Sequence, residues 1–202
     1  MTGFVPVETD LMTIEELKAD GLWPQEWTSI SGLIPYIKRQ GPDLVGLEIG
    51  VARGESSYTI LEKCPNVKKL YGIDPYKAFD DWVGHIDQAH NDKTKEIAIK
   101  NLSEFGDRFV SVFGLDSKTV AMDDGFFQES LDFIFIDGDH SYEGALFDME
   151  SFYPLVKKGG LFSGHDYNLP TVQKALVEFR NKNKIRIPIN NSSNSVWFWS
   201  KV

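Results

Sequence analysis

The chain has 202 residues, of which 42% are hydrophobic and 25% charged, a composition typical of one folded globular domain. Its 21 lysine and arginine residues face 30 aspartate and glutamate residues, which gives a formal charge of -9. This balance argues against nucleic-acid or membrane partners that are bound through bulk positive charge. The single cysteine, Cys64, excludes an internal disulfide and fits a reducing compartment. Residues 1–10 show no secretory pattern, and no apolar run approaches the roughly 20 residues of a membrane helix, so we expect a cytoplasmic protein.

Short apolar runs alternate with helical patterns, which is typical of a mostly parallel α/β sheet. We expect seven strands, at 44–49, 69–73, 109–113, 131–136, 160–163, 185–189 and 195–200. We expect helices at 56–63, 94–105, 142–156 and 171–181. The run LDFIFI is almost wholly apolar, as a central strand covered on both faces should be. The polar turn 190–194 has no room for a crossover helix, so it predicts a final hairpin and one antiparallel strand.

The chain divides into a preface and a core within a single expected domain. Residues 1–43 precede the first strand and carry apolar side chains, which predicts an N-terminal helical cap. Residues 44–202 hold the alternating elements and form the predicted core. The long connection 75–93 is typical of a lid or a binding loop.

A glycine-containing turn follows the first expected strand in the sequence LEIGVARGES, residues 47–56. Gly50 and Gly54 would let the backbone approach a ligand at the carboxyl end of the strand. The segment is neither G-x-G-x-x-G nor a P-loop, so it does not predict a pyrophosphate ligand. Asp74 ends the second strand, where an acid can accept hydrogen bonds from ribose hydroxyls. Each feature alone could serve a tight turn or a loop cap, but together they favour a nucleoside site.

Acids and histidines follow the fourth and fifth expected strands. Asp137, Asp139 and His140 end the fourth strand, and His165 and Asp166 end the fifth. Neighbouring parallel strands lie about 4.8 Å apart, so these side chains can converge at one sheet edge. Carboxylates suit Mg²⁺, Ca²⁺ or Mn²⁺, and an added imidazole shifts the preference towards Mn²⁺, Fe²⁺ or Zn²⁺. Two alternatives stay open: His140 could cap the following helix, and His165 could be a general base without a metal.

On these residues the chain resembles the class I S-adenosylmethionine-dependent methyltransferases. The segments IDGDHSYEG (136–144) and GHDY (164–167) are similar to the bacterial group called methyltransferase family 24. The resemblance covers roughly residues 44–200, although Ala52 stands where the family often has glycine. It implies a doubly wound, seven-stranded, mostly parallel Rossmann-like sheet with its last strand antiparallel.

The resemblance also implies roles for individual residues. It implies S-adenosylmethionine as cofactor, with Glu48 near its amino group, Asp74 on the ribose, and Asp116 and Ser117 beside the adenine. The full expected cofactor set is Glu48, Gly50, Gly54, Ser56, Asp74, Asp116, Ser117 and Asp137. Metal-dependent O-methyltransferases of the wider family carry metal ligands at positions that Asp137, His165 and Asp166 match, although the His-Asp pair departs from their acid–amide pattern. The expected catalytic residues are His165, His140 and Asp137, with Mg²⁺ or Mn²⁺ as the candidate metals.

The expected function is therefore O-methylation of a small molecule, a sugar or a secondary-metabolite hydroxyl, with divalent-metal assistance as an option. The alternatives are a protein that binds S-adenosylmethionine without this catalysis, and an NAD-dependent oxidoreductase on a similar sheet. The missing G-x-G-x-x-G speaks against the oxidoreductase. We expect a small-molecule partner, no nucleic acid and no membrane, and the sequence leaves a homo-oligomer open.

Overall fold

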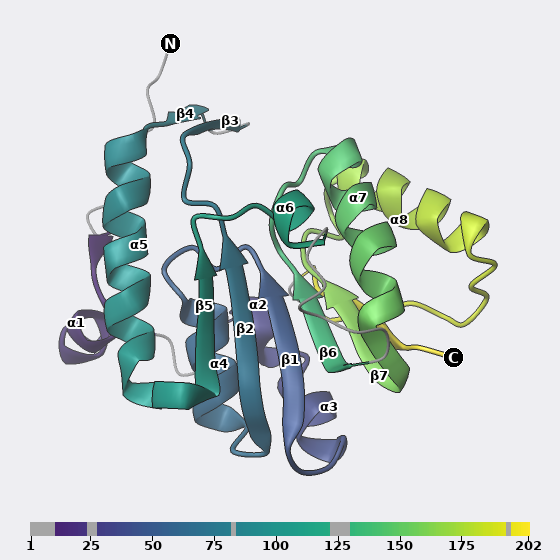
Figure 1. The fold of residues 1–202 in the computed structure, drawn as a ribbon, viewed down its shortest axis with the longest axis horizontal. Coiled ribbons are helices and arrows are strands. Elements are labelled where there is room, and N and C mark those ends of the chain that lie inside the picture. Colours follow the sequence, from purple (N-terminus) through teal and green to yellow (C-terminus); the bar gives the residue numbers. More distant parts are fainter. Residues whose placement is uncertain (1–10, 24–27, 82–83, 122–129, 193–194) are drawn as a thin grey trace.

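The computed structural model describes residues 11–23, 28–81, 84–121, 130–192 and 195–202. Over these residues seven strands form one sheet in the order β5-β2-β1-β6-β7-β9-β8 (Figure 1). The strands of this sheet are β1 (Leu44–Ile49), β2 (Val67–Asp74), β5 (Phe109–Phe113), β6 (Leu131–Ile136), β7 (Val156–Gly164), β8 (Asn190–Asn191) and β9 (Trp197–Ser200). Strands β5, β2, β1, β6 and β7 run parallel, and β9 is antiparallel to both β7 and β8. The predicted doubly wound sheet with an antiparallel last strand is confirmed.

Helices cover both faces of the sheet (Figure 1). They are α1 (Ile14–Ala19), α2 (Thr28–Ser31), α3 (Ile34–Arg39), α4 (Glu55–Lys63), α5 (Gln88–Leu102), α6 (Ser117–Ala121), α7 (Tyr142–Phe152) and α8 (Pro170–Lys182). Two short 3₁₀ turns, η2 (Ser103–Arg108) and η3 (Tyr153–Leu155), lead into β5 and β7. Each of these helices is too short or too polar to cross a bilayer, in the part of the chain that the structure describes.

The core has one apolar layer on each side of the sheet. Ile134 and Ile136 of β6 join the layer under α6, α7 and α8, whereas Phe133 and Phe135 join the layer under α2, α3 and α4. Successive residues of a strand point to opposite faces of the sheet. Helices cover both faces, so all four side chains are buried. This explains the unbroken apolar run of this central strand.

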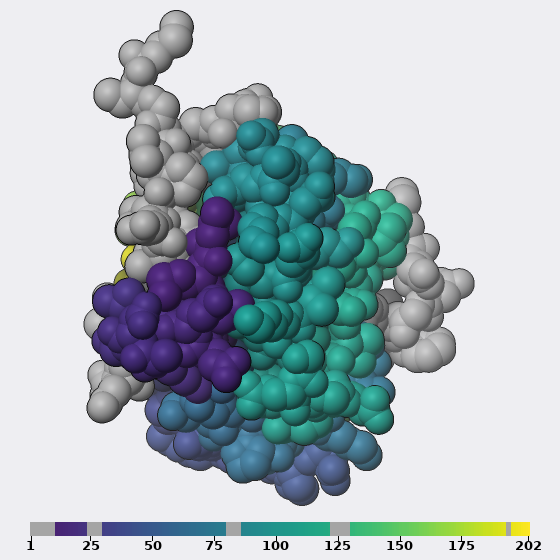
Figure 2. Space-filling view, turned by 90° about the vertical axis from the view of Figure 1, so that its left-hand side faces the viewer, coloured from purple at the N-terminus to yellow at the C-terminus, as the bar shows by residue number. Residues whose placement is uncertain are grey.

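The described part of the N-terminal cap is helical and packs on the core. Ile30, Leu33 and Ile37 are fully buried against the layer that contains α4. Helix α1 lies beside α5 (Figure 2), and the N–H of Ile14 donates to Oδ1 of Asn101 at 2.9 Å. Residues 1–10 and 24–27 of the predicted cap lie outside the described residues.

One predicted strand is wrong and several predicted boundaries differ; β7, for example, begins at Val156 and not at 160. No strand forms at 185–189, and β8 instead lies within the predicted turn. Pro188 has no N–H to donate to a sheet, and the side chains of Ile187 and Ile189 pack against the core. The Ile187 carbonyl accepts a hydrogen bond from the Arg180 side chain instead of from a strand. Helix α7 ends at Phe152 rather than 156, because Pro154 cannot continue it.

The long connection after β2 holds more regular structure than the sequence predicted. It contains the antiparallel hairpin of β3 (Phe79–Asp81) and β4 (Gly84–Ile86), followed by the first turns of α5. The helix starts at Gln88, not at 94, because the Asp87 side chain accepts a hydrogen bond from the N–H of His90. Figure 1 shows the hairpin beyond the carboxyl ends of β2 and β5.

Candidate active site

The strand order changes direction between β1 and β6, the place where open α/β sheets bind their ligands. Gly50 follows β1 there with φ +84, and Asp137 follows β6. The N–H of Asp137 donates to the carbonyl of Ile49 at 2.7 Å. A Cβ on Gly50 would lie 2.0 Å from the carbonyl oxygen of Asp137. Gly50 therefore allows the turns after β1 and β6 to pack backbone against backbone.

Asp74 holds the β1 turn in shape. Its Oδ2 accepts hydrogen bonds from the N–H groups of Val51 and Ala52, both at 3.0 Å, and its Oδ1 accepts from Tyr76 at 2.8 Å. The Tyr76 hydroxyl donates to the Ala52 carbonyl at 2.7 Å. Burial raises the pKa of Asp74, against the lowering effect of its three N–H partners. A carboxylate has about four acceptor positions, so Asp74 supports the turn with three hydrogen bonds and has room to accept one more.

Glu48 is buried at the floor of this region, 1% exposed, and accepts a short hydrogen bond from the Ser57 hydroxyl. Burial is the main cause that raises the pKa of Glu48 well above its usual range, and the nearby Asp137, Glu55 and Asp74 add to it. This burial favours the neutral form of Glu48, and a cation that enters beside it would favour the charged form.

A cavity of about 260 Å³ opens over this floor. It is lined by Glu48, Gly50, Val51, Ala52, Glu55, Ser56, Asp137 and His140. Three of these residues are acids; Glu55 is paired with Arg53, and Glu48 and Asp137 are the carboxyl groups that could face a positively charged ligand. Five of them, Glu48, Gly50, Ser56, Asp137 and His140, were predicted as site residues.

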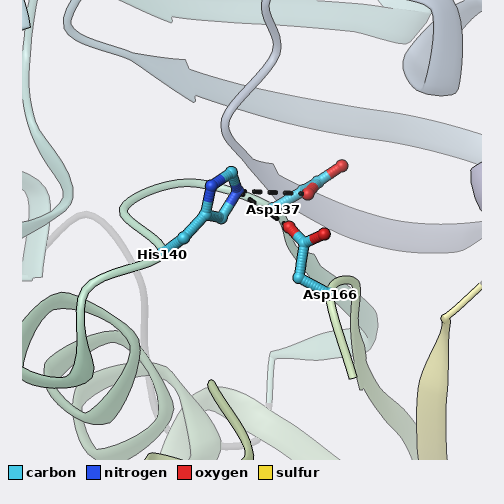
Figure 3. Close-up of side chains that lie close together, drawn as sticks. All are labelled: Asp137, His140 and Asp166. Atoms are coloured by element: carbon cyan, nitrogen blue, oxygen red, sulfur yellow. Dashed lines mark ion pairs between the residues drawn. The ribbon is translucent and has the colours of Figure 1, made fainter. Parts of the chain in front are cut away.

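Two aspartates and two histidines meet beside the cavity. Nε2 of His140 lies 2.9 Å from Oδ2 of Asp166 and 3.7 Å from Oδ1 of Asp137 (Figure 3). Nδ1 of His165 lies 3.2 Å from Oδ1 of Asp166 and 3.4 Å from Oδ1 of Asp137. We call these four residues the Asp-His cluster. The structure thus brings together all the predicted catalytic and metal-binding residues.

Backbone and indole hydrogen bonds fix the end of β7, which carries His165 and Asp166 of the cluster. The N–H of His165 donates to the Ile136 carbonyl at 3.0 Å, and the Trp197 indole donates to the His165 carbonyl at 2.8 Å. Asp166 has φ +56, a conformation that aspartate tolerates better than most residues and that is often found at functional sites. The end of β7 is therefore fixed on both sides before its two polar side chains project from the sheet edge.

The charges in the cluster stabilise one another. Hydrogen bonding with Asp137 and Asp166 raises the pKa of His140 to about 10. Burial opposes the charge of His165, but the same two carboxylates outweigh it and raise its pKa to about 10. Burial likewise opposes the charge of Asp166, and the imidazoles still hold its pKa far below the usual range. The two carboxylates therefore favour the protonated form of both imidazoles, a form that cannot accept a further proton.

Asp137, His140 and Asp166 lie close enough together to hold a metal ion between them. Each offers one ligand atom, and these atoms lie within 4.8 Å of one another. Carboxylate oxygens and an imidazole nitrogen are a suitable donor set for a divalent cation. The chemistry of the donors therefore fits the metal that the sequence suggested.

Other predicted residues support the site from outside the cavity. Gly54, φ +87, precedes α4, and a Cβ there would lie 2.9 Å from Leu102. Asp116 caps α6, because its Oδ1 accepts from the N–H of Thr119 at 2.8 Å and from its hydroxyl at 2.6 Å. Ser117 is the first residue of that helix. The cavity described above does not reach Asp116 and Ser117.

The sequence analysis missed two acids of this region. Glu55 lines the cavity and lies 2.5 Å from the Arg53 guanidinium. Its place directly after Gly54, at the start of a helix, is a signal that could have identified it. Asp148 is 1% exposed on α7, and a Cβ on Gly138 would lie 3.7 Å from its Oδ2. Asp148 lies among the apolar residues of its helix in the sequence, and the helical pattern does not show on which side of the helix it is buried.

A family model and a curated protein match parts of this chain. A family model described as a methyltransferase domain matches residues 47–167. The uncharacterised protein R132 of Acanthamoeba polyphaga mimivirus is 26% identical over 146 residues, covering 68% of this chain and 62% of the viral protein. The chain thus matches less than two thirds of that relative's length.

Solved structures show the same architecture. The O-methyltransferase from Bacillus cereus in complex with SAH has a TM-score of 0.63 and 18% identity, covering 98% of this chain and 93% of that one. The O-methyltransferase NovP has a TM-score of 0.57 and 20% identity, covering 93% of this chain and 88% of its own. At these identities the similarity shows the fold that the three chains share.

Proposed function

Since this chain belongs to the methyltransferase-domain family, we propose that it transfers the methyl group of S-adenosylmethionine to a hydroxyl of a small molecule. The family match covers the β1 turn, Asp74 and the whole Asp-His cluster. The two similar structures named as O-methyltransferases, one of them in complex with SAH, support oxygen as the acceptor atom. A sugar or a secondary metabolite would supply that hydroxyl.

One observation carries the proposal: a single cavity joins Glu48 at its floor to Asp137 and His140 at its edge. S-adenosylmethionine carries a positive ammonium group and a positive sulfonium group, which match the carboxyl groups of Glu48 and Asp137. Glu48 would face the ammonium group, and the remaining acceptor position of Asp74 would take a ribose hydroxyl. The methyl group would then point towards the Asp-His cluster, where the acceptor binds.

Methyl transfer needs an oxygen in line with the bond from sulfur to carbon, so the main task of the protein is positioning. Asp137 would orient the acceptor, and His165 or His140 would receive the hydroxyl proton. The two aspartates favour the protonated form of both imidazoles, and only an imidazole in its neutral form would receive this proton.

Asp137 and Asp166, with an imidazole from His140 or His165, would hold a divalent cation. A divalent metal supplies Lewis-acid chemistry: it orients oxygen ligands and lowers the pKa of a hydroxyl. The ligand atoms of Asp137, His140 and Asp166 lie within 4.8 Å of one another, which supports this part of the proposal.

Calorimetric titration with S-adenosylhomocysteine tests the cofactor site. The wild type should bind it, and Glu48→Gln should weaken binding by about tenfold or more, since the charge that faces the ammonium group is lost. Glu62→Gln, on the half-exposed side of α4, is the matched control and should bind like the wild type. No binding to the wild type would refute the function. A panel of sugars, catechols and other polyols, read by mass spectrometry for the gain of one methyl group, then identifies the acceptor class.

A further inference from the structure

We propose that His140 is the imidazole ligand of the metal site, and that it makes the site prefer Mn²⁺, or another first-row transition metal, to Mg²⁺. The inference rests on the proposed function in one respect only: it assigns ligands and metal preference to the metal site of the same cleft. It differs from the sequence prediction, which used His165 as the imidazole ligand.

The two histidines of the cluster are placed differently. Nε2 of His140 is closed off from solvent and points between the two aspartates (Figure 3). It lies 2.9 Å from Oδ2 of Asp166 and 3.7 Å from Oδ1 of Asp137, so it faces an oxygen of each carboxylate. A buried nitrogen that faces two carboxylate oxygens is in the position of a metal ligand.

His165 suits a supporting role. Its Nδ1 faces Oδ1 of Asp166 and Oδ1 of Asp137, whereas the closest oxygen to His140 is Oδ2 of Asp166. Ligating carboxylates usually accept a hydrogen bond from a further group, which fixes their orientation. We therefore assign His165 as a positioning residue that orients both aspartates. The group formed by Asp137, His140 and Asp166 offers three ligand atoms within 4.8 Å of one another.

The donor set determines the preference between metals. Mg²⁺ prefers oxygen ligands in near-ideal octahedral geometry and gives up its water reluctantly. An imidazole nitrogen binds more strongly to Mn²⁺, Fe²⁺, Co²⁺ and Zn²⁺, in the rising order of the Irving–Williams series. Two carboxylates and one imidazole therefore favour a transition metal, and Mn²⁺ is the probe that can be observed directly.

Electron paramagnetic resonance of free Mn²⁺ measures binding without any methyl acceptor. The wild type should bind Mn²⁺, and a large excess of Mg²⁺ should not displace it. His140→Ala should weaken Mn²⁺ binding by about tenfold or more, the scale seen when a metal site loses part of its support. His90→Ala, on α5 away from the cluster, is the matched control and should bind like the wild type.

His140→Asp gives the sharper result, because it replaces the nitrogen with an oxygen donor and keeps a ligand in place. In this variant Mg²⁺ should compete with Mn²⁺ at comparable concentrations. His165→Asn should retain the preference for Mn²⁺ with weaker binding. Mn²⁺ affinity that is unchanged in His140→Ala, or Mg²⁺ that displaces Mn²⁺ equally well from the wild type and from His140→Asp, would overturn the inference.

Titration with S-adenosylhomocysteine separates this inference from the proposed function. Cofactor binding and methyl transfer by a wild type that does not bind Mn²⁺ would overturn the metal assignment and leave the methyltransferase function intact. Mn²⁺ binding that depends on His140, in a protein that does not bind the cofactor, would support the metal site and refute the function. Circular dichroism of each variant checks that it folds.

Discussion

Gly50→Ala tests the contact that joins the turns after β1 and β6. Alanine at φ +84 is strained by about 1–2 kcal/mol. Its Cβ would also lie 2.0 Å from the carbonyl oxygen and 2.5 Å from the carbonyl carbon of Asp137. These atoms belong to the backbone, so no side-chain rotation relieves the clash, and overpacking of this kind costs about 1–3 kcal/mol more. We expect a total loss of about 2–5 kcal/mol in the free energy of unfolding.

Gly114→Ala is the matched control for this prediction. Gly114 has φ +88, almost the same as Gly50, but a Cβ there would meet nothing within 4 Å. It should cost only the backbone strain, about 1–2 kcal/mol. Urea denaturation of both variants, followed by circular dichroism, gives the difference between them. Equal losses of unfolding free energy in the two variants would refute the reasoning, because the clash with the Asp137 backbone would then add no destabilisation. The Gly50 variant should also bind S-adenosylhomocysteine more weakly, since Asp137 lines the cavity.

Three further predictions address other parts of the site. Burial raises the pKa of Asp148 to about 6, so the folded state holds its proton more tightly than the unfolded chain, and wild-type stability falls as the pH rises from about 4 to 6. Asp148→Asn should remove that loss, so the variant should be more stable than the wild type by at most about 3 kcal/mol at pH 8, with little difference at pH 4. Urea denaturation at both pH values measures this, and an equal difference at the two pH values would refute the reasoning. Glu143→Gln, exposed on the same helix, is the control. Asp74→Asn should weaken S-adenosylhomocysteine binding by about tenfold or more in calorimetry, because the N–H groups of the β1 turn lose a charged acceptor. Unchanged affinity would contradict the proposal that Asp74 shapes the cofactor site. Asn101→Ala should lower the free energy of unfolding by about 2 kcal/mol or more, because the Asn101 side chain accepts a hydrogen bond from the N–H of Ile14 at 2.9 Å and donates one to the Arg53 carbonyl at 2.8 Å. A loss below about 0.5 kcal/mol in urea denaturation would show that α1 does not depend on this link.

Local patterns were enough for three of the parallel strands, of which β1 and β6 are central and β5 lies at the edge of the sheet. The predicted strands at 44–49, 109–113 and 131–136 match β1, β5 and β6 residue for residue. A strand buried on both faces needs consecutive apolar side chains, and this requirement is visible in a few adjacent letters. The same holds for the residues at the strand ends, because parallel strands bring their carboxyl ends to one edge and so place Gly50, Asp74, Asp137 and His165 together.

Errors arose where a residue far away in the sequence, or one proline, decides the outcome. The alternating isoleucines at 185–189 have the period of a strand, yet they only anchor a loop to the core. The start of α5 depends on one cap, the side chain of Asp87. Periodicity counts apolar positions and does not see these single interactions.

The sequence by itself determined the fold class, the edge of the sheet that carries the site, and the types of residue found there. Only the tertiary structure decided that Gly50 packs on Asp137, that Asp148 is buried, and that Nε2 of His140 points between the two aspartates. The physical reason is range. Strand type and strand-end chemistry follow from neighbours along the chain, whereas distances between side chains of different loops depend on packing and turn geometry, which no local pattern encodes.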